Sequence, residues 1–120
     1  MVEKVPCGLK CFLLENKKYL VFWENLITKD SINEVLNVLH TETKNHFFSK
    51  WKTIIVVGKT DSHFEAKELF YFDNESTFVV FVLVDDTSND IFMNDSWIFA
   101  LGCNFRRHVR TISGIIKKNL

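Results

Sequence analysis

Two short motifs in this 120-residue sequence have the residue types of phosphate-binding and nucleophilic sites. Gly58-Lys59-Thr60 resembles the end of a phosphate-binding loop, but that loop needs a glycine five residues earlier, where Thr53 stands. Cys103 precedes an expected helix, where backbone N–H groups favour a thiolate, but the arginine of a phosphatase-type loop would fall at Val109. We therefore expect a strand-ending turn at Gly58 and a buried or neutral thiol at Cys103.

A third motif, Glu65-Ala66-Lys67, has the Glu-x-Lys form found in many metal-dependent nucleases, with Asp61 as a candidate second carboxylate. In such enzymes the motif closes an apolar strand and the aspartate belongs to a preceding strand. Here His63 and Phe64 are a poor lead-in for a strand, and the spacing is cramped. A small metal-dependent hydrolase or nuclease is therefore only the third functional hypothesis.

The remaining polar side chains show no spacing typical of a metal site. Aspartates near two expected turns match no calcium-loop pattern, and turn aspartates commonly bond their own backbone. Two cysteines four residues apart and four scattered histidines match no zinc-site spacing. We therefore expect no metal, no cofactor and no catalytic residues. The residues considered are Asp85, Asp86, Asp90, Asp95, Cys7, Cys11, His40, His46, His63 and His108.

The C-terminal stretch supplies the candidate partner-binding residues, which are Arg106, Arg107, Arg110, Lys117 and Lys118. The arginines fall at the start of an expected helix, where the positive pole of the helix disfavours cations. A sequence that breaks a local rule often does so for a contact elsewhere. That contact is either internal, with Asp85, Asp86, Asp90 or Asp95, or external, with an acidic protein surface or a nucleic acid.

The length and composition indicate one globular domain covering residues 1–120. The net charge is zero, yet residues 1–60 carry +3, residues 61–95 carry −8 and residues 96–120 carry +5. Three cysteines in no disulfide-scaffold pattern favour a reducing compartment. No apolar run is long enough for a signal peptide or a membrane span, so we expect a cytoplasmic protein.

The fold is expected to be organised around a hairpin over residues 68–86. Its second arm, residues 77–84, is apolar at every position after Thr77, which predicts a central strand covered on both faces. Further strands are expected over residues 11–15, 19–24, 53–57, 91–93 and 97–101. Trp51 flanks the strand over 53–57 and is expected in the core.

Two helices are expected to complete the domain. The first begins at Ser31, with Glu34 completing a capping box, and ends near Lys44. The second runs from about Asn104 to the C-terminus. The order is roughly β-β-α-β-β-β-(β)-β-α, which predicts an α+β domain with an antiparallel or mixed sheet of about five to seven strands. Two helices leave sheet surface to cover, so a homodimer through that face is a further hypothesis.

The leading functional hypothesis is a small non-catalytic protein-binding module of the inhibitor, immunity or assembly-subunit type. Its partner is another protein or a second copy of the chain. The alternative is a nucleic-acid-binding module that uses the basic C-terminal helix, and exposed aromatic residues beside basic ones would support it. An enzyme would instead require a concave pocket that gathers several of Asp61, His63, Glu65, Asp85, Asp86 and Cys103.

Overall fold

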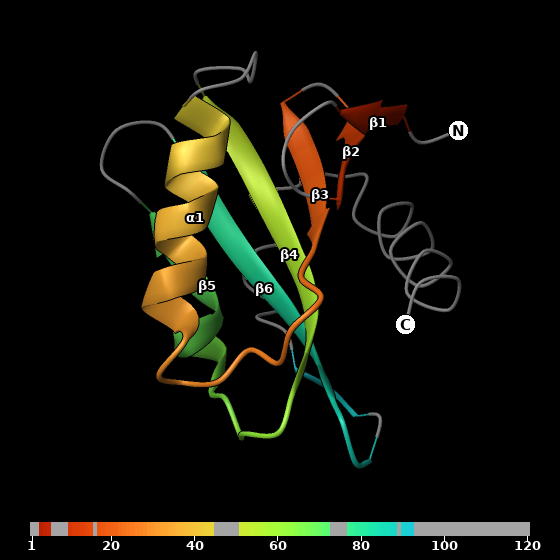
Figure 1. Cartoon of the computed structure of the whole chain (residues 1–120), viewed down its shortest axis with the longest axis vertical. Helices are drawn as coiled ribbons and strands as arrows, with labels where there is room; N and C mark the ends of the chain where they lie inside the picture. Colours follow the sequence, from red (N-terminus) through yellow and green to blue (C-terminus); the bar gives the residue numbers. More distant parts are fainter. Residues whose placement is uncertain are drawn as a thin grey trace.

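The apolar run of the expected hairpin forms β6 (Thr77–Asp85), the strand on which half of the sheet is assembled (Figure 1). In this computed structural model, residues 3–5, 10–15, 17–44, 51–72, 77–88 and 90–92 are described. On one side β6 pairs in parallel with β4 (Lys52–Thr60) along its whole length. On its other side it pairs antiparallel with β5 (Phe70–Phe72) and, further along, with β7 (Ile91–Phe92).

The other half of the sheet is built from the N-terminal part of the chain. Strand β1 (Glu3–Val5) pairs antiparallel with β2 (Lys10–Glu15), and β2 pairs antiparallel with β3 (Lys18–Phe22). Strand β3 then lies parallel to β4, which gives the order β1-β2-β3-β4-β6-β5. The sheet is therefore mixed, with three parallel strands at its centre.

Helix α1 (Ile32–Lys44) connects β3 to β4. Because these strands are parallel, the chain must return to the end of the sheet where both begin, and the helix makes that return. Figure 1 shows α1 lying across one face of the sheet, with its C-terminal end beside the start of β4. The last turns of α1 therefore lie over the starting ends of the central strands.

The start of α1 is capped differently from the sequence prediction. The Ser31 hydroxyl accepts a hydrogen bond from the Thr28 backbone N–H at 2.8 Å, and the Thr28 hydroxyl accepts one from the Ser31 N–H at 3.2 Å. The reciprocal pair is thus Thr28 with Ser31, and the expected pairing of Ser31 with Glu34 is wrong. The helix still begins and ends where expected, because the apolar stripe decides its length.

Both faces of the central strands are buried, as the unbroken apolar runs predicted. One cluster lies under α1 and includes Val79, Phe81 and Leu83 from β6. The other lies on the opposite face, where the buried residues Leu20, Phe22, Ile55, Val57, Val80 and Val82 are at most 4% exposed. The centre of that face is buried within one chain, so the argument for a dimer through an open sheet face loses its premise.

Strand β4 does not stop at Gly58, as was expected, but continues to Thr60. A Cβ atom at Gly58 would lie 2.7 Å from Ile27 Cδ1 and 3.4 Å from Trp23 Cβ. These residues belong to the segment that leaves β3, and the Ile27 N–H donates to the Lys59 carbonyl at 2.8 Å. Gly58 therefore marks a close crossing of the chain over β4, where a side chain would require the end of the Ile27 side chain to move.

The α+β class and the mixed sheet are confirmed, and the hairpin of β5 and β6 pairs as expected. Strand β1 was missed, because three residues are too few to show alternation. The expected hairpin was to begin at Glu68, but residues Ala66–Leu69 form a short 3-10 helix. The first arm of the hairpin, β5, is therefore only three residues long. The expected strand over 97–101 and the expected C-terminal helix lie outside the described residues.

Phe81→Ala tests the two-sided burial of β6. Phe81 is fully buried under α1 and makes an edge contact with Tyr71 at a ring-centroid distance of 5.6 Å. Removing the ring leaves a cavity, so we expect a loss of about 3–5 kcal/mol in the free energy of unfolding. Urea denaturation measures it, with the exposed Ile91→Ala as a control that changes stability little. A loss below about 1 kcal/mol for Phe81→Ala would contradict the burial.

Candidate functional site

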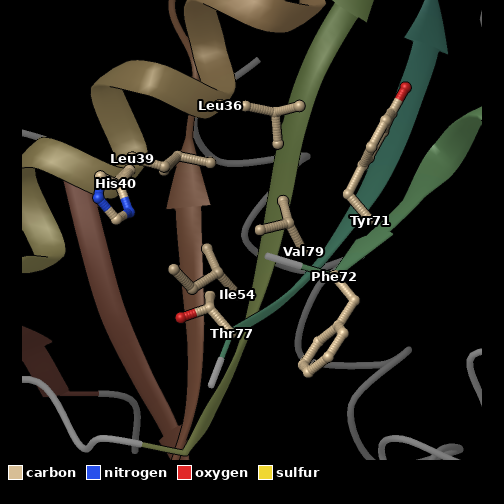
Figure 2. Close-up of a pocket in the computed structure, with 8 residues that line it drawn as sticks. All are labelled: Leu36, Leu39, His40, Ile54, Tyr71, Phe72, Thr77 and Val79. Atoms are coloured by element: carbon tan, nitrogen blue, oxygen red, sulfur yellow. The ribbon is translucent and has the colours of Figure 1, made fainter. Parts of the chain in front are cut away.

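The described residues form an apolar pocket of about 170 Å³ beneath the last turns of α1 (Figure 2). Leu36, Leu39 and His40 line it from the helix. Their spacing of three and four residues places them on neighbouring positions of one helix surface. Leu39 is buried and Leu36 is half-buried, so the pocket begins where the core cluster under α1 ends.

The opposite wall of the pocket comes from the sheet. Ile54 of β4 pairs with Val79 of β6, and Val79 pairs with Tyr71 of β5. These three residues form one row across neighbouring strands, on the face that α1 covers. Thr77 lies two residues before Val79 and therefore on the same face, and Phe72 lies at the sheet edge. Figure 2 shows the helix and strand residues converging on the space between them.

Three of the residues that line this apolar space, His40, Thr77 and Tyr71, carry polar groups. Burial, and then the nearby Glu68 carboxylate, raise the pKa of Tyr71 above its usual value. Tyr71 therefore stays protonated at neutral pH and can donate a hydrogen bond. An apolar pocket with a few polar groups at its border is a typical binding site for an apolar group that also carries a hydrogen-bonding atom.

The expected acidic residues lie at the other end of the sheet. Asp85 ends β6 beside Thr60, its partner at the end of β4. The Asp85 carboxylate accepts hydrogen bonds from the backbone N–H groups of Thr87 at 2.8 Å and Ser88 at 3.0 Å. These bonds, from Ser88 first and then Thr87, lower the pKa of Asp85. Asp85 therefore organises the turn between β6 and β7.

The Glu-x-Lys motif also has a structural role. Glu65 precedes the 3-10 helix, its backbone N–H donates to the Glu68 carboxylate at 3.1 Å, and its carbonyl accepts the Glu68 N–H at 2.9 Å. The Glu65 carboxylate and the Lys67 ammonium form an exposed ion pair at 3.6 Å. The motif thus begins a short helix on the surface, and it does not end a strand.

No three of the His, Cys, Asp and Glu side chains in the described ranges lie close enough together to hold a metal ion. Asp61 and Asp86 directly follow the paired residues Thr60 and Asp85 at the ends of β4 and β6, whereas the His63 ring contacts Phe92 of β7 at a ring-centroid distance of 5.4 Å. None of them, nor Glu65, lines the pocket. Cys103 and the five basic residues proposed to bind a partner, Arg106, Arg107, Arg110, Lys117 and Lys118, lie outside the described residues, as does Asp95.

Sequence reasoning missed the pocket and misplaced one aromatic residue. The pocket residues come from three separate segments, and only the pairing of β4, β5 and β6 brings them together. Trp51 was expected in the core because it adjoins a buried strand, but its side chain is 54% exposed. The strand begins at Lys52, so Trp51 lies just outside the paired region.

No protein family, curated protein or solved structure matches this chain. The function has to be argued from the geometry alone. Within the described part of the chain, no helix has both the length and the hydrophobicity that crossing a membrane requires.

The lowered pKa of Asp85 gives a test by pH. In the unfolded chain the Asp85 carboxyl has a pKa of about 4, and its hydrogen bonds stabilise the fold at any pH above that value. This stabilisation is lost as the pH falls through the lower pKa that Asp85 has in the folded protein. We therefore expect Asp85→Asn to have a lower Tm than the wild type at pH 6, and we expect this difference to shrink towards pH 2.5. Thermal denaturation followed by circular dichroism measures both.

The matched control is Asp86→Asn, which changes the exposed neighbouring carboxylate in the same turn. Its Tm difference from the wild type should stay nearly constant over the same pH range. A difference for Asp85→Asn that is equally constant would show that the turn does not depend on the ionised carboxylate.

Proposed function

We propose that this chain is a non-catalytic protein-binding module, and that the pocket beneath α1 receives an apolar side chain of the partner. The observation that carries the proposal is the composition of the pocket. Five of its eight lining residues are aliphatic or Phe, and none of the eight is acidic. Interfaces commonly gain most of their affinity from one or two such buried anchors.

The size of the pocket supports an anchor rather than a substrate. Pockets for small-molecule ligands commonly enclose about 300–1,000 Å³. An apolar cavity of about 150 Å³ accommodates one benzene ring. The pocket beneath α1, at about 170 Å³, is therefore suited to a single leucine, methionine or phenylalanine side chain.

The strand beside the pocket supports a protein partner as well. Within the described residues, β5 ends the sheet, and no strand pairs with its outer side. Backbone groups on such an edge can bond an added strand, while a neighbouring pocket selects one of its side chains. Phe72, at the end of β5, is 42% exposed and adds apolar surface next to the pocket.

This proposal covers the inhibitor, immunity and assembly-subunit types alike, since each works by docking on another protein. A second copy of the chain is also a protein partner, so a homodimer remains within the proposal. What the proposal requires in every case is an apolar side chain that enters the pocket between α1 and β5.

Leu36→Trp tests the role of the pocket. Leu36 lies at its border, and an indole at this position would fill the space that the partner's side chain needs (Figure 2). A phage-displayed library of random twelve-residue peptides is selected against the wild-type chain. We expect the enriched peptides to share one large apolar residue, and we expect Leu36→Trp to weaken their binding at least tenfold in fluorescence anisotropy.

The matched control is Asn33→Trp, which adds the same ring to an exposed position on α1 that does not line the pocket. It should bind the selected peptides as the wild type does. The proposal fails if the library yields no shared apolar residue, or if the two tryptophan variants bind equally well. Thermal denaturation of both variants shows that the comparison is made between folded proteins.

A further inference from the structure

The face of the sheet away from α1 carries a row of four residues at the starting ends of its strands. Lys18 of β3 pairs with Thr53 of β4, and Thr53 pairs with Phe78 of β6. Phe78 then pairs with Phe72 of β5. Residues paired across strands lie on one face, and alternation places these with Leu20, Ile55 and Val80 of the second core cluster. We call these four residues the cross-strand row.

The row ends in accessible aromatic rings. Phe72 and Phe78 stack with their ring centroids 4.6 Å apart and their planes 28° apart. Phe70 adds a third ring, 5.7 Å from Phe78. Phe72 is 42% exposed, and Trp51, two residues before Thr53, is 54% exposed. Together with the half-buried Phe70 and Phe78, Phe72 forms a contiguous apolar patch at this edge of the sheet, and contiguous patches can mark interaction sites.

Lysines flank these rings, and the described aspartates are remote from them. Lys17 and Lys18 lie at the start of β3, and Lys52 lies at the start of β4 beside Trp51. The described aspartates of the acidic segment, Asp61, Asp85, Asp86 and Asp90, gather at the opposite ends of β4 and β6, near Lys59. Glutamates are present at this end too, since Glu15 of β2 pairs with Lys18 and Glu42 lies in the last turn of α1. Lys52 pairs with Thr77 on the face that α1 covers, so Lys17 and Lys18 are the lysines on the side of the rings.

We propose that this end of the sheet binds single-stranded nucleic acid, with bases stacked on Trp51 and Phe72 and phosphates close to Lys17 and Lys18. Proteins that bind single strands of any sequence combine two components. Bases stack on aromatic rings, and basic side chains attract the phosphates of the nucleic acid. Thr53 in the middle of the row is buried, so the accessible rings lie on its two sides, Trp51 before β4 and Phe72 on the edge strand β5. This site is distinct from the basic C-terminal stretch that the sequence singled out.

The combination of rings and lysines selects a single strand among anionic partners. A duplex keeps its bases stacked inside, so the rings would gain nothing from it. An acidic peptide offers carboxylates to the lysines but no flat face to Trp51. Binding to a duplex or to an acidic peptide would therefore be weaker and would not depend on the aromatic residues.

The inference is independent of the proposed protein-binding pocket. The pocket lies on the face covered by α1, and the cross-strand row lies on the other face, with Phe72 at the edge that they share. Trp51 does not line the pocket, so Trp51→Ala should weaken nucleic-acid binding and leave binding of the selected peptides unchanged. Failure of either proposal can thus be told from failure of the other.

The experiment measures fluorescence anisotropy of a labelled twelve-residue oligothymidine on the full chain at 50 and 200 mM NaCl. With about two phosphates neutralised, we expect the affinity to fall roughly 7-fold between these salt concentrations. Trp51→Ala should weaken binding about 5- to 100-fold, because one stacked base is lost. Trp51→Phe, which keeps a ring, should recover most of the affinity. Ile91→Ala, which changes an exposed apolar residue outside the row, is the matched control and should bind as the wild type does.

Competition identifies the chemistry that is bound. An unlabelled oligothymidine should displace the probe, whereas a duplex of equal length and polyglutamate should displace it at least tenfold less well. The proposal is overturned if the probe does not bind at 50 mM NaCl, if Trp51→Ala binds as the wild type does, or if polyglutamate competes equally. Wild-type binding by Trp51→Ala would indicate a general anion-binding surface. Equal competition by polyglutamate would indicate an acidic protein partner.

Discussion

The two-sided burial of β6 is the constraint on which the rest of the structure depends. A strand that is apolar on both faces has to lie inside the sheet, with neighbours on both edges and cover on both sides. Strand β4 supplies one neighbour in parallel, and a parallel pair needs a long return connection. The same requirement between β3 and β4 places α1 across one face. The pocket follows from this, because it opens where the cover of α1 meets the short edge strand β5.

The two ends of the parallel strands have different chemistry. Where β4 and β6 end, aspartates bond the backbone of turns and short helical segments that leave the sheet. Where the strands begin, Trp51, Phe72 and Lys17 are exposed, and the pocket lies on the other side of the same end. The acidic residues that suggested catalysis in the sequence thus stabilise turns. The surfaces that we propose bind partners consist of apolar and basic side chains.

The polar motifs of the sequence have structural roles because their side chains accept hydrogen bonds from nearby backbone N–H groups. The Asp85 carboxylate accepts hydrogen bonds from the backbone of the turn that follows β6. Glu65 begins the 3-10 helix, and its backbone N–H donates to the Glu68 carboxylate. Such residues are already committed to local structure. Leu36, Trp51 and Phe72 make no such local bonds, and they border the pocket or the rings that we propose bind partners.

Several features were determined by the sequence alone, because each rests on a pattern within one short segment. These are the α+β class, the extent of α1, the hairpin of β5 and β6, and the burial of β6 on both faces. Only the tertiary structure decided the features that join distant segments. The pairing of Val79 with Ile54 on one side and Tyr71 on the other creates the pocket wall, and the crossing at Ile27 brings its side chain against Gly58 within a strand. Local periodicity carries no information about which strands become neighbours, and that choice decided where Trp51 and Phe72 meet solvent.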